Sequence, residues 1–513
     1  MIPVPMKFIK KNKEIQIPEN INYKENQALG SEAYKITVNA NGAFVEYSDH
    51  RGKIWADQTL KSITKNGKIS ECEIYDYPQY HHRGLNFDVS RHFFIVEEVK
   101  KVLDMMSMLK MNVLHWHLSD DQGFRIESFK FPDLQKESID YYTQEQIRDI
   151  VNYAEERGIE VVPEIDMPGH TRAILAARPD LSCTKRKLKP GKDAGIYKRI
   201  FCAGNEAVYT FLEELFDEIL PLFKSNRFHI GGDEAPKAMW KACPLCNAKL
   251  KELGLNNMQE LQGYFGRRVT DILKKYGKRP IMWNDALVGK KVSKDAQIQY
   301  WTPSYNRQTV EFVKAGGEWI FSDMHEVYLD YPYSMTGLKK MYEMVMDFAD
   351  EGGFESYPPI GMEACIWTER VDSDEKLEER LLPRLFALAE LSWSGRVSTY
   401  EEFEERCKEE AERFSQIGYT VKDQAWWNPK GEEAKLEAEA FMKSMSTGCI
   451  EEDPEEMANW EEEQAEEGKN NYAAGQKYKE RFLDMWGSVP NVVKLSLQTL
   501  EITGVSKFQI ASD

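Results

Sequence analysis

The sequence has no hydrophobic run long enough to cross a membrane. A membrane-spanning helix needs roughly 20 consecutive apolar residues, and no stretch of the 513-residue chain approaches that length. The first segment, Met1 to Lys7, also lacks the long apolar core of a secretory signal. We therefore expect a cytoplasmic protein with no membrane span.

Positive charge is in deficit. The chain carries 67 Lys and Arg against 85 Asp and Glu, which gives a formal net charge of −18. Nucleic-acid binding needs clustered basic residues that neutralise phosphates. We therefore expect no nucleic acid as a partner.

Cysteine is sparse as well. The eight cysteines are spread along the chain and form no dense disulfide framework. Cys243-Pro244-Leu245-Cys246 is a single CxxC motif, and zinc sites of this type usually need a second pair of ligands. Because the sequence contains no second CxxC, we expect reduced cysteines here and no bound metal.

The first 80 residues predict a small α/β domain. Ala33–Val38 alternates polar and apolar residues as a strand does, and Asn41-Gly42 is a turn signal before a second strand, Ala43–Tyr47. A helix is expected within Lys53–Ser62. The chain exceeds the roughly 250–300 residues over which one core grows, so further domains must follow.

Residues 81–395 predict a (β/α)8 TIM barrel. Short apolar runs alternate there with longer helical segments, which is typical of βα units around a parallel sheet. Eight such runs agree with the strand number of this barrel. The candidate strands are Gly84–Val89, Asn112–Leu118, Glu160–Ile165, Arg227–Ile230, Pro280–Trp283, Ala296–Tyr300, Trp319–Ser322 and Pro359–Ile366.

Residues 396–513 predict a mainly helical C-terminal region. They are rich in Glu and Lys, with apolar residues at helical spacing. The strongly acidic run Glu451–Glu467 is expected to be a solvated helical or loop surface. Such a region could pair two copies of the chain, so a homodimer is a possible assembly.

Two adjacent carboxylates follow the fourth candidate strand, in the sequence Gly231-Gly232-Asp233-Glu234. Burying ionised groups costs several kcal/mol, on the order of the figures for isolated charges, so the pair is unsuited to a core. It suits acid–base chemistry, in which one acid holds a proton and its neighbour does not. His170, on a loop after Pro168-Gly169, could hydrogen-bond Glu234 and set its proton affinity.

Tryptophans stand at the same ends of the predicted strands. Active sites of TIM barrels lie at the C-terminal strand ends, where Trp283, Trp301 and Trp367 adjoin polar residues. Indole faces stack on sugar rings while carboxylates bind the hydroxyls. The combination indicates a carbohydrate site. His115, His117 and His229 lie on apolar strands and are more typical of core residues.

These motifs resemble glycoside hydrolase family 20, the β-N-acetylhexosaminidases. The resemblance covers about residues 83–395, and the family often carries a small α/β domain before its barrel. Asn86 stands where the family usually has an apolar residue. The matching segments are Arg83–Phe93, Asn112–Arg125, Pro163–His170, His229–Glu234, Trp283, Tyr300-Trp301, Tyr328–Asp330 and Glu363–Glu369.

The resemblance implies a retaining exo-β-N-acetylhexosaminidase that acts on oligosaccharides or glycoconjugates with a terminal β-linked GlcNAc or GalNAc. The substrate's own 2-acetamido oxygen would attack the anomeric carbon and form an oxazoline-type intermediate, without a cofactor. By motif, Glu234 is the general acid and later the base. Asp233 holds the acetamido N–H, and Tyr328 hydrogen-bonds the acetamido oxygen.

The resemblance also implies the binding residues. Trp283, Trp301 and Trp367 would wall the sugar pocket. Arg83 would bind the 3- and 4-hydroxyls beside Glu369, and Asp330 would hold the outer hydroxyls. Asp120 and His170 would stand behind Glu234.

Three alternatives remain open from the sequence. A disaccharide-releasing hexosaminidase would share the same motifs. His115-x-His117 on a barrel strand resembles the metal-binding pair of amidohydrolases. A non-catalytic sugar-binding protein would be expected to have lost at least one of Asp233, Glu234 and Tyr328, and all are present.

Overall fold

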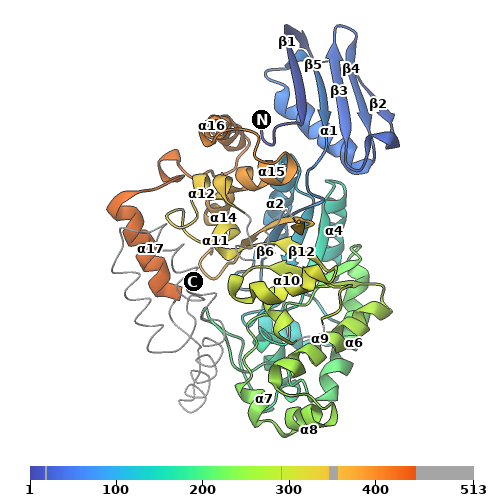
Figure 1. The fold of residues 1–513 in the computed structure, drawn as a ribbon, viewed down its shortest axis with the longest axis vertical. Helices are drawn as coiled ribbons and strands as arrows, with labels where there is room; N and C mark the ends of the chain where they lie inside the picture. The colour runs from blue at the N-terminus through green and yellow to red at the C-terminus, as the bar shows by residue number, and fades with distance from the viewer. Residues whose placement is uncertain (18–19, 290–291, 346–355, 446–513) are drawn as a thin grey trace.

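The computed structural model describes the chain except for residues 18–19, 290–291, 346–355 and 446–513. A five-stranded sheet lies at one extremity, helices α7 (Ala238–Ala242) and α8 (Pro244–Glu252) lie at the other, and a barrel lies between them (Figure 1). The predicted helical C-terminal region is represented by α16 (Tyr400–Gln416) and α17 (Gly431–Met445). The acidic run Glu451–Glu467 lies outside the described residues.

The N-terminal sheet has the strand order β1-β5-β3-β4-β2, in which only β2 and β4 pair in parallel. The predicted strands and helix correspond to β3, β4 and α1, whereas β1, β2 and β5 were not predicted. Helix α1 packs through Trp55, Ala56 and Leu60 against the inward residues of β3 and β5. The bounds are β1 (Lys7–Gln16), β2 (Ile21–Glu25), β3 (Tyr34–Asn39), β4 (Gly42–Tyr47), α1 (His50–Ile63) and β5 (Lys68–Asp76).

Eight parallel strands close into a barrel in chain order, with β9 beside β10 and β13 beside β6. The prediction of a TIM barrel is confirmed, and every strand lies within two residues of its predicted bounds. The strands are β6 (His82–Asp88), β7 (Val113–His117), β8 (Glu160–Glu164), β9 (Arg227–His229), β10 (Arg279–Trp283), β11 (Gln297–Tyr300), β12 (Glu318–Phe321) and β13 (Gly361–Ile366).

Helices cover the outside of the barrel. Several begin where a side chain caps free N–H groups, as at Thr143, whose capping box starts α4. None of the described helices combines the length and apolar character needed to span a bilayer. The main helices are α2 (Val96–Met108), α4 (Gln144–Glu155), α6 (Glu206–Ile219), α9 (Met258–Lys275), α10 (Asn306–Lys314), α12 (Leu338–Glu343) and α15 (Arg384–Trp393).

The shorter elements fill the loops. After β10 the described chain forms a 3-10 helix, η4 (Asn284–Gly289), where the other repeats place an α-helix. The remaining short helices are η1 (Gln27–Leu29), α3 (Asp133–Ser138), α5 (Arg172–Ala177), η2 (Pro179–Leu181), η3 (Leu220–Leu222), η5 (Pro303–Tyr305), α11 (Met324–Val327), α14 (Asp374–Leu381) and η6 (Gln424–Trp426).

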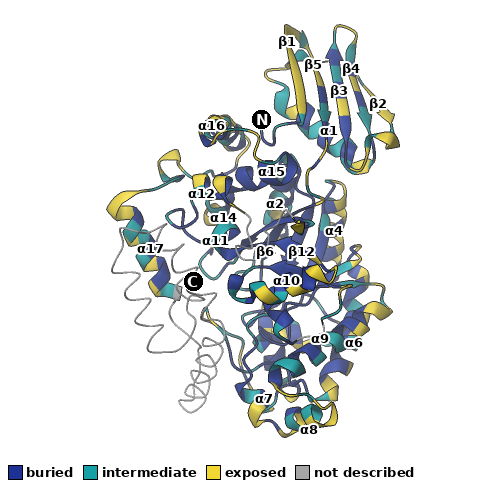
Figure 2. Cartoon of the chain, viewed as in Figure 1, coloured by how far each residue is buried: buried dark blue, intermediate teal, exposed yellow. Residues whose placement is uncertain are grey.

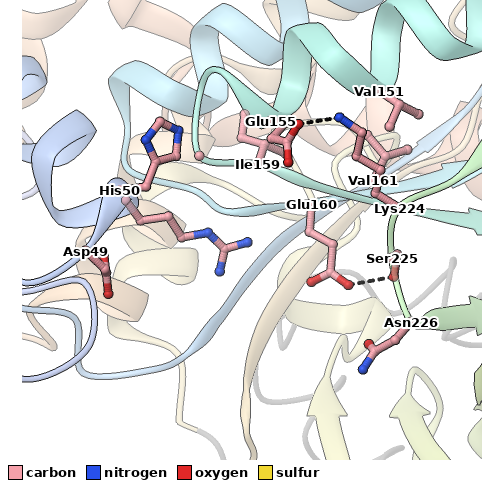
Figure 3. A pocket seen from close by; sticks show the side chains of 12 residues that line it. Asp49, His50, Val151, Glu155, Ile159, Glu160, Val161, Lys224, Ser225 and Asn226 are labelled. Atoms are coloured by element: carbon pink, nitrogen blue, oxygen red, sulfur yellow. Dashed lines mark hydrogen bonds and ion pairs between the residues drawn. The ribbon is translucent and has the colours of Figure 1, made fainter.

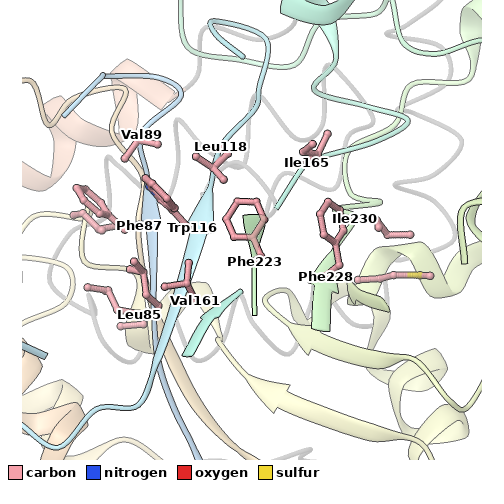
Figure 4. Packing of buried hydrophobic residues seen from close by; sticks show 14 of the residues in the cluster. Leu85, Phe87, Val89, Trp116, Leu118, Val161, Ile165, Phe223, Phe228 and Ile230 are labelled. Atoms are coloured by element: carbon pink, nitrogen blue, oxygen red, sulfur yellow. The ribbon is translucent and has the colours of Figure 1, made fainter. Parts of the chain in front are cut away.

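Strand alternation divides the barrel residues between two environments. Outward residues such as Leu85, Phe87 and Trp116 pack against the helices (Figure 4). Inside, Val113, Val162 and three other apolar residues form one layer. Figure 2 shows the barrel strands buried and the outer helix faces exposed. Successive residues of a strand point to opposite faces, so every second strand residue is directed into the barrel interior, beneath the site.

Candidate active site

A cavity of about 140 Å³ opens at the C-terminal ends of the barrel strands. It gathers Asp233, Glu234 and Tyr328 with the three predicted tryptophans, and with Asp330, Glu369 and His170. Every predicted site residue except Arg83 and Asp120 lines this cavity, and Asp120 lies behind it against His170. The lining also contains Arg91, His117, Asp166, Met324, Tyr331 and Arg370.

A sharp turn after β9 presents Glu234 to this cavity. Gly231 has φ 65°, and a β-carbon there would lie 1.6 Å from Asp166 Oδ1, so only glycine fits. Glu234 itself adopts φ 41°, an uncommon conformation for a residue with a side chain, and its backbone N–H donates to Asp285 Oδ2 at 2.9 Å. Burial raises the pKa of Asp285 to about 7.

His170 lies behind the acid pair, as the sequence predicts. Its Nε2 is 3.3 Å from Glu234 Oε2 and 3.7 Å from Asp233 Oδ2. Its Nδ1 is 3.1 Å from Asp120 Oδ1 and 3.4 Å from Asp121 Oδ2. Burial by itself lowers the pKa of His170. The surrounding carboxylates, of which Asp120 has the largest effect, raise this pKa well above its ordinary value. The imidazolium form can thus donate a hydrogen bond to Glu234.

Asp120 is placed by two cations. Arg91 Nη2 lies 2.8 Å from its Oδ2, and His117 Nε2 lies at the same distance. Burial by itself raises the pKa of Asp120, but the positive charges of Arg91 and His170 hold this pKa below its ordinary value. Asp120 is therefore the ionised partner of His170.

Asp166, at the end of β8, forms a second carboxylate pair with Asp233. Burial raises the pKa of Asp233 well above its ordinary value, and the charge of Asp166 raises it further. Burial likewise raises the pKa of Asp166. The carboxylates of Asp166 and Asp233 lie within 4.8 Å of each other, so the pair holds one proton between them. Asp166 lies within the matched segment Pro163–His170, but only the fold shows that it contacts Asp233.

We expect Asp166→Asn to move the acid limb of the kcat/KM profile to lower pH. The substitution removes a like charge beside Asp233, so the pKa of Asp233 falls and its carboxylate persists in more acidic solution. The pH dependence of kcat/KM reports groups of the free enzyme. Asp271→Asn, an exposed aspartate on α9, is the matched control. An unchanged or upward-shifted acid limb in Asp166→Asn would contradict the coupling.

The aromatic side of the cavity is built from four strand ends. Trp301 stacks parallel to Tyr328 with ring centroids 6.5 Å apart, and Trp367 lies 5.8 Å from Trp283. Trp283 Nε1 donates to Glu164 Oε1 at 3.0 Å, which fixes its indole plane. These rings form an apolar wall opposite the acids.

Buried groups fix the Tyr328 loop from below. Tyr328 forms a parallel bridge with Cys365 of β13, and Arg384 Nη1 of α15 donates to the Tyr331 carbonyl at 2.9 Å. Helix α17 covers the outer side of this loop, where the rings of Phe441 and Tyr331 pack with their centroids 5.1 Å apart. The C-terminal region, for which the sequence gave no link to chemistry, thus supports the wall of the cavity.

The predicted role of Arg83 is wrong. Arg83 stands at the start of β6, at the opposite end of the barrel from the cavity, and is 1% exposed. It forms an ion pair with Glu32 of the N-terminal domain. Lys110 binds Asp76 in the same way, at 2.7 Å. These pairs join the N-terminal domain to the barrel.

Arg91, just past the end of β6, takes the position at the cavity. Its guanidinium lies 5.0 Å from the Trp367 ring centre. Burial lowers the pKa of Arg91, but the charges of Asp120, Asp88 and Glu369 raise it well above its ordinary value. The rule that barrel sites lie at C-terminal strand ends would have selected Arg91, because Arg83 begins the strand.

Asp330 faces the cavity beside Glu369. Burial raises the pKa of Asp330 to about 7, and the charge of Glu369 contributes. Its Oδ1 has no hydrogen-bond partner among the described residues. A buried acceptor without a partner costs stability, so this atom is suited to a ligand hydroxyl.

Beneath the cavity, buried carboxylates hold the histidines of the strands. His115 lies 2.7 Å from Glu363 and 3.0 Å from Glu164, and His229 Nδ1 is 2.8 Å from Glu164. His115 and His229 are therefore buried core residues in contact with carboxylates, as the sequence indicates. His117 is buried too, but it also lines the cavity.

Another hollow, of about 520 Å³, lies at the other end of the barrel (Figure 3). Its lining includes Asp49, His50 and Arg51 at the start of α1, together with Glu160 and Lys224. Glu160 accepts a hydrogen bond from Ser225 at 2.6 Å, and Lys224 pairs with Glu155. Arg51, Glu160 and Lys224 are held in ion pairs. Among the described residues no tryptophan lines this hollow, so the site chemistry belongs to the cavity at the strand ends.

The fold and the cavity place this protein among the TIM-barrel glycoside hydrolases. Comparison with known families refines that class. Residues 80–396 match glycosyl hydrolase family 20, catalytic domain, and residues 5–77 match glycosyl hydrolase family 20, domain 2. The chain belongs to glycosyl hydrolase family 20.

Relatives of known name agree with this assignment. A β-hexosaminidase of Porphyromonas gingivalis is 36% identical over 399 residues, which are 71% of this chain but only 51% of that protein. The structure of β-N-acetylhexosaminidase from Bacteroides fragilis is similar, with a TM-score of 0.75, 29% identity and coverage of 82% of this chain and 96% of that one. An exo-β-N-acetylglucosaminidase of Vibrio harveyi, solved with N-acetylglucosamine, gives a TM-score of 0.74, 25% identity and coverage of 82% and 78%.

Proposed function

We propose that the protein is a retaining exo-β-N-acetylhexosaminidase that removes terminal β-linked GlcNAc or GalNAc by substrate-assisted catalysis. One observation carries the proposal: the adjacent carboxylates Asp233 and Glu234 line one cavity with Tyr328 and a tryptophan wall. Family membership and the named relatives support the same activity.

In the proposed first step, the 2-acetamido oxygen attacks the anomeric carbon as the glycosidic bond breaks. Glu234 gives its proton to the leaving oxygen. Asp233 accepts a hydrogen bond from the acetamido N–H and offsets the positive charge that develops there. Tyr328 donates its hydroxyl hydrogen bond to the acetamido oxygen.

In the second step, water attacks the anomeric carbon of the oxazoline-type intermediate. Glu234 takes the water's proton, and the ring opens to restore the acetamido group, so two inversions retain the configuration. His170 and Asp120 orient Glu234 through both steps. No carboxylate nucleophile is needed, which agrees with two acids placed side by side rather than across the sugar.

Sugar recognition is assigned to the rest of the lining. Trp283, Trp301 and Trp367 hold the ring and the acetyl group by apolar contact. Arg91 replaces Arg83 as the cation for the hydroxyls beside Glu369. Asp330 offers its unpartnered Oδ1 to an outer hydroxyl.

The test compares 4-nitrophenyl N-acetyl-β-glucosaminide with the matching β-glucoside, which differ only at C2. We expect release of nitrophenol from the acetamido sugar alone. Cleavage of both would mean that the acetamido group is not the nucleophile. Cleavage of neither, together with release from a disaccharide glycoside, would favour the disaccharide-releasing alternative.

A further inference from the structure

Four cysteine sulfurs converge at the α7–α8 end of the molecule. Cys202 Sγ lies 3.7 Å from Cys243 Sγ and 3.6 Å from Cys246 Sγ, and Cys183 Sγ lies 3.9 Å from Cys246 Sγ. All four sulfurs lie within 4.8 Å of one another, and none is in a disulfide. The sequence-based expectation that the CxxC motif stands alone is therefore wrong.

The missing pair comes from the loop between β8 and α6. Cys183 follows η2, and Cys202 follows an isolated bridge between Ser182 and Phe201 that brings the two ends of this loop together. Cys243 caps α8 and Cys246 lies in its first turn. Cys183 and Cys202 are separated by 18 residues and form no CxxC motif. Their pairing with the CxxC motif could therefore not be predicted from the sequence.

The spacing of the sulfurs matches a tetrahedral metal site. Zinc–sulfur bonds of about 2.3 Å in a tetrahedron separate the sulfurs by about 3.8 Å. Three of the six sulfur–sulfur distances in the cluster are 3.6–3.9 Å, and all six are within 4.8 Å. A disulfide would need about 2.05 Å. We propose that Cys183, Cys202, Cys243 and Cys246 bind one zinc ion as a structural site. Binding releases the four thiol protons, and no electrons are transferred.

The surroundings are those of a closed site. Cys202, Cys243 and Cys246 are buried and belong to the main hydrophobic core, and Cys183 is half-buried. A β-carbon on Gly204 would lie 2.3 Å from the backbone of Leu245, so glycine allows the two chain segments to touch. With four thiolates and no open position, a bound ion would be structural rather than catalytic.

Hydrogen bonds near the sulfurs hold both segments. Trp240 Nε1 donates to the Phe201 carbonyl at 2.8 Å, and the Asn205 N–H donates to the Cys202 carbonyl at 3.0 Å. Asn247 Nδ2 donates to the Cys243 carbonyl at 2.9 Å. Such backbone contacts preset the ligand positions, as residues around metal ligands commonly do.

The proposed ion would link two loops of the active-site end. One is the segment after β8 that contains His170. The other is the segment after β9 that contains Asp233 and Glu234 and continues into α7 and α8 (Figure 1). Glu234 and His170 face each other at 3.3 Å. The zinc link would hold these two loops together from the side away from the cavity.

The first test measures metal in the intact chain purified without chelator. We expect one zinc per chain by elemental analysis in the wild type and in the control Cys407→Ser, whose buried cysteine lies on α16 outside the cluster. Cys202→Ser and Cys246→Ser are expected to lose stoichiometric zinc. Cys183→Ser, at the half-buried edge, is the variant most able to fold without the ion and is expected to bind zinc more weakly.

A second measurement does not depend on the variants. Cobalt in place of zinc is expected to give the visible absorption of a tetrahedral tetrathiolate site. Metal-free wild type, iron in place of zinc, or peptide masses showing disulfides among the four cysteines would each overturn the proposal. Hydrolase activity is not the readout, so failure here leaves the proposed function standing.

Discussion

Glu234→Gln is expected to lower kcat on a β-N-acetylhexosaminide by a factor of about 10²–10⁴, the range for loss of a general acid–base group. The amide keeps the size and can still contact His170, 3.3 Å from Oε2 in the wild type. It cannot give a proton to the leaving oxygen or take one from water. The loss should be larger with a sugar or alkyl aglycone than with nitrophenol, because nitrophenolate leaves without needing a full proton.

The measurement is kcat and KM at several pH values for two N-acetylhexosaminides, one with a sugar or alkyl aglycone and one with nitrophenol. The matched control is Glu145→Gln, an exposed glutamate in the first turn of α4, which should keep wild-type rates. Near-normal turnover of the sugar aglycone by Glu234→Gln would rule out this residue as the acid. An equal loss on both aglycones would place its role in the second step alone.

The barrel could be read from the sequence because its strands carry a local signal. Each strand is a short, largely buried run between helical segments, as in Val113–His117. Parallel strands of this kind have continuous apolar stretches in their sequence. The outer strand β1 gave no such signal. Its residues are mostly exposed and half of them are charged. Its place is set by pairing with β5, about fifty to seventy residues later in the chain.

The site could be predicted where its residues stand in one motif. Asp233 and Glu234 follow a strand, and His170 follows another, so strand-end geometry brings them together. Contacts between distant segments could not be predicted. The coupling of Asp166 to Asp233 and the gathering of Cys183 and Cys202 beside the CxxC motif depend on how loops from different strands meet.

Arg83 and Arg91 show how a correct motif can give a wrong residue. Both belong to the segment Arg83–Phe93, but a seven-residue strand separates its two ends. With a rise of about 3.3 Å per residue, one end meets the N-terminal domain and the other meets the cavity. Only direction along the strand decides which arginine can touch a ligand.

Asp233→Asn is expected to lower kcat by a factor of about 10²–10³, the scale for removing one preorganised electrostatic contact in a transition state. The charge on the acetamido group grows as the oxazoline-type intermediate forms, so the carboxylate contributes most in the transition state. KM should change little. The measurement is kcat and KM on the N-acetylglucosaminide.

The same variant should be more stable than the wild type. Burial and Asp166 raise the pKa of Asp233 in the folded protein, so ionising it costs folding free energy as the pH rises above the ordinary aspartate range. The neutral amide removes that cost, and Tm at neutral pH should rise while kcat falls. A variant that gains stability while it loses activity indicates that the wild-type charge serves function at a cost in folding free energy. An unchanged kcat with a raised KM would contradict the role of Asp233, and a fall in Tm together with kcat would mean that the variant damages the fold instead.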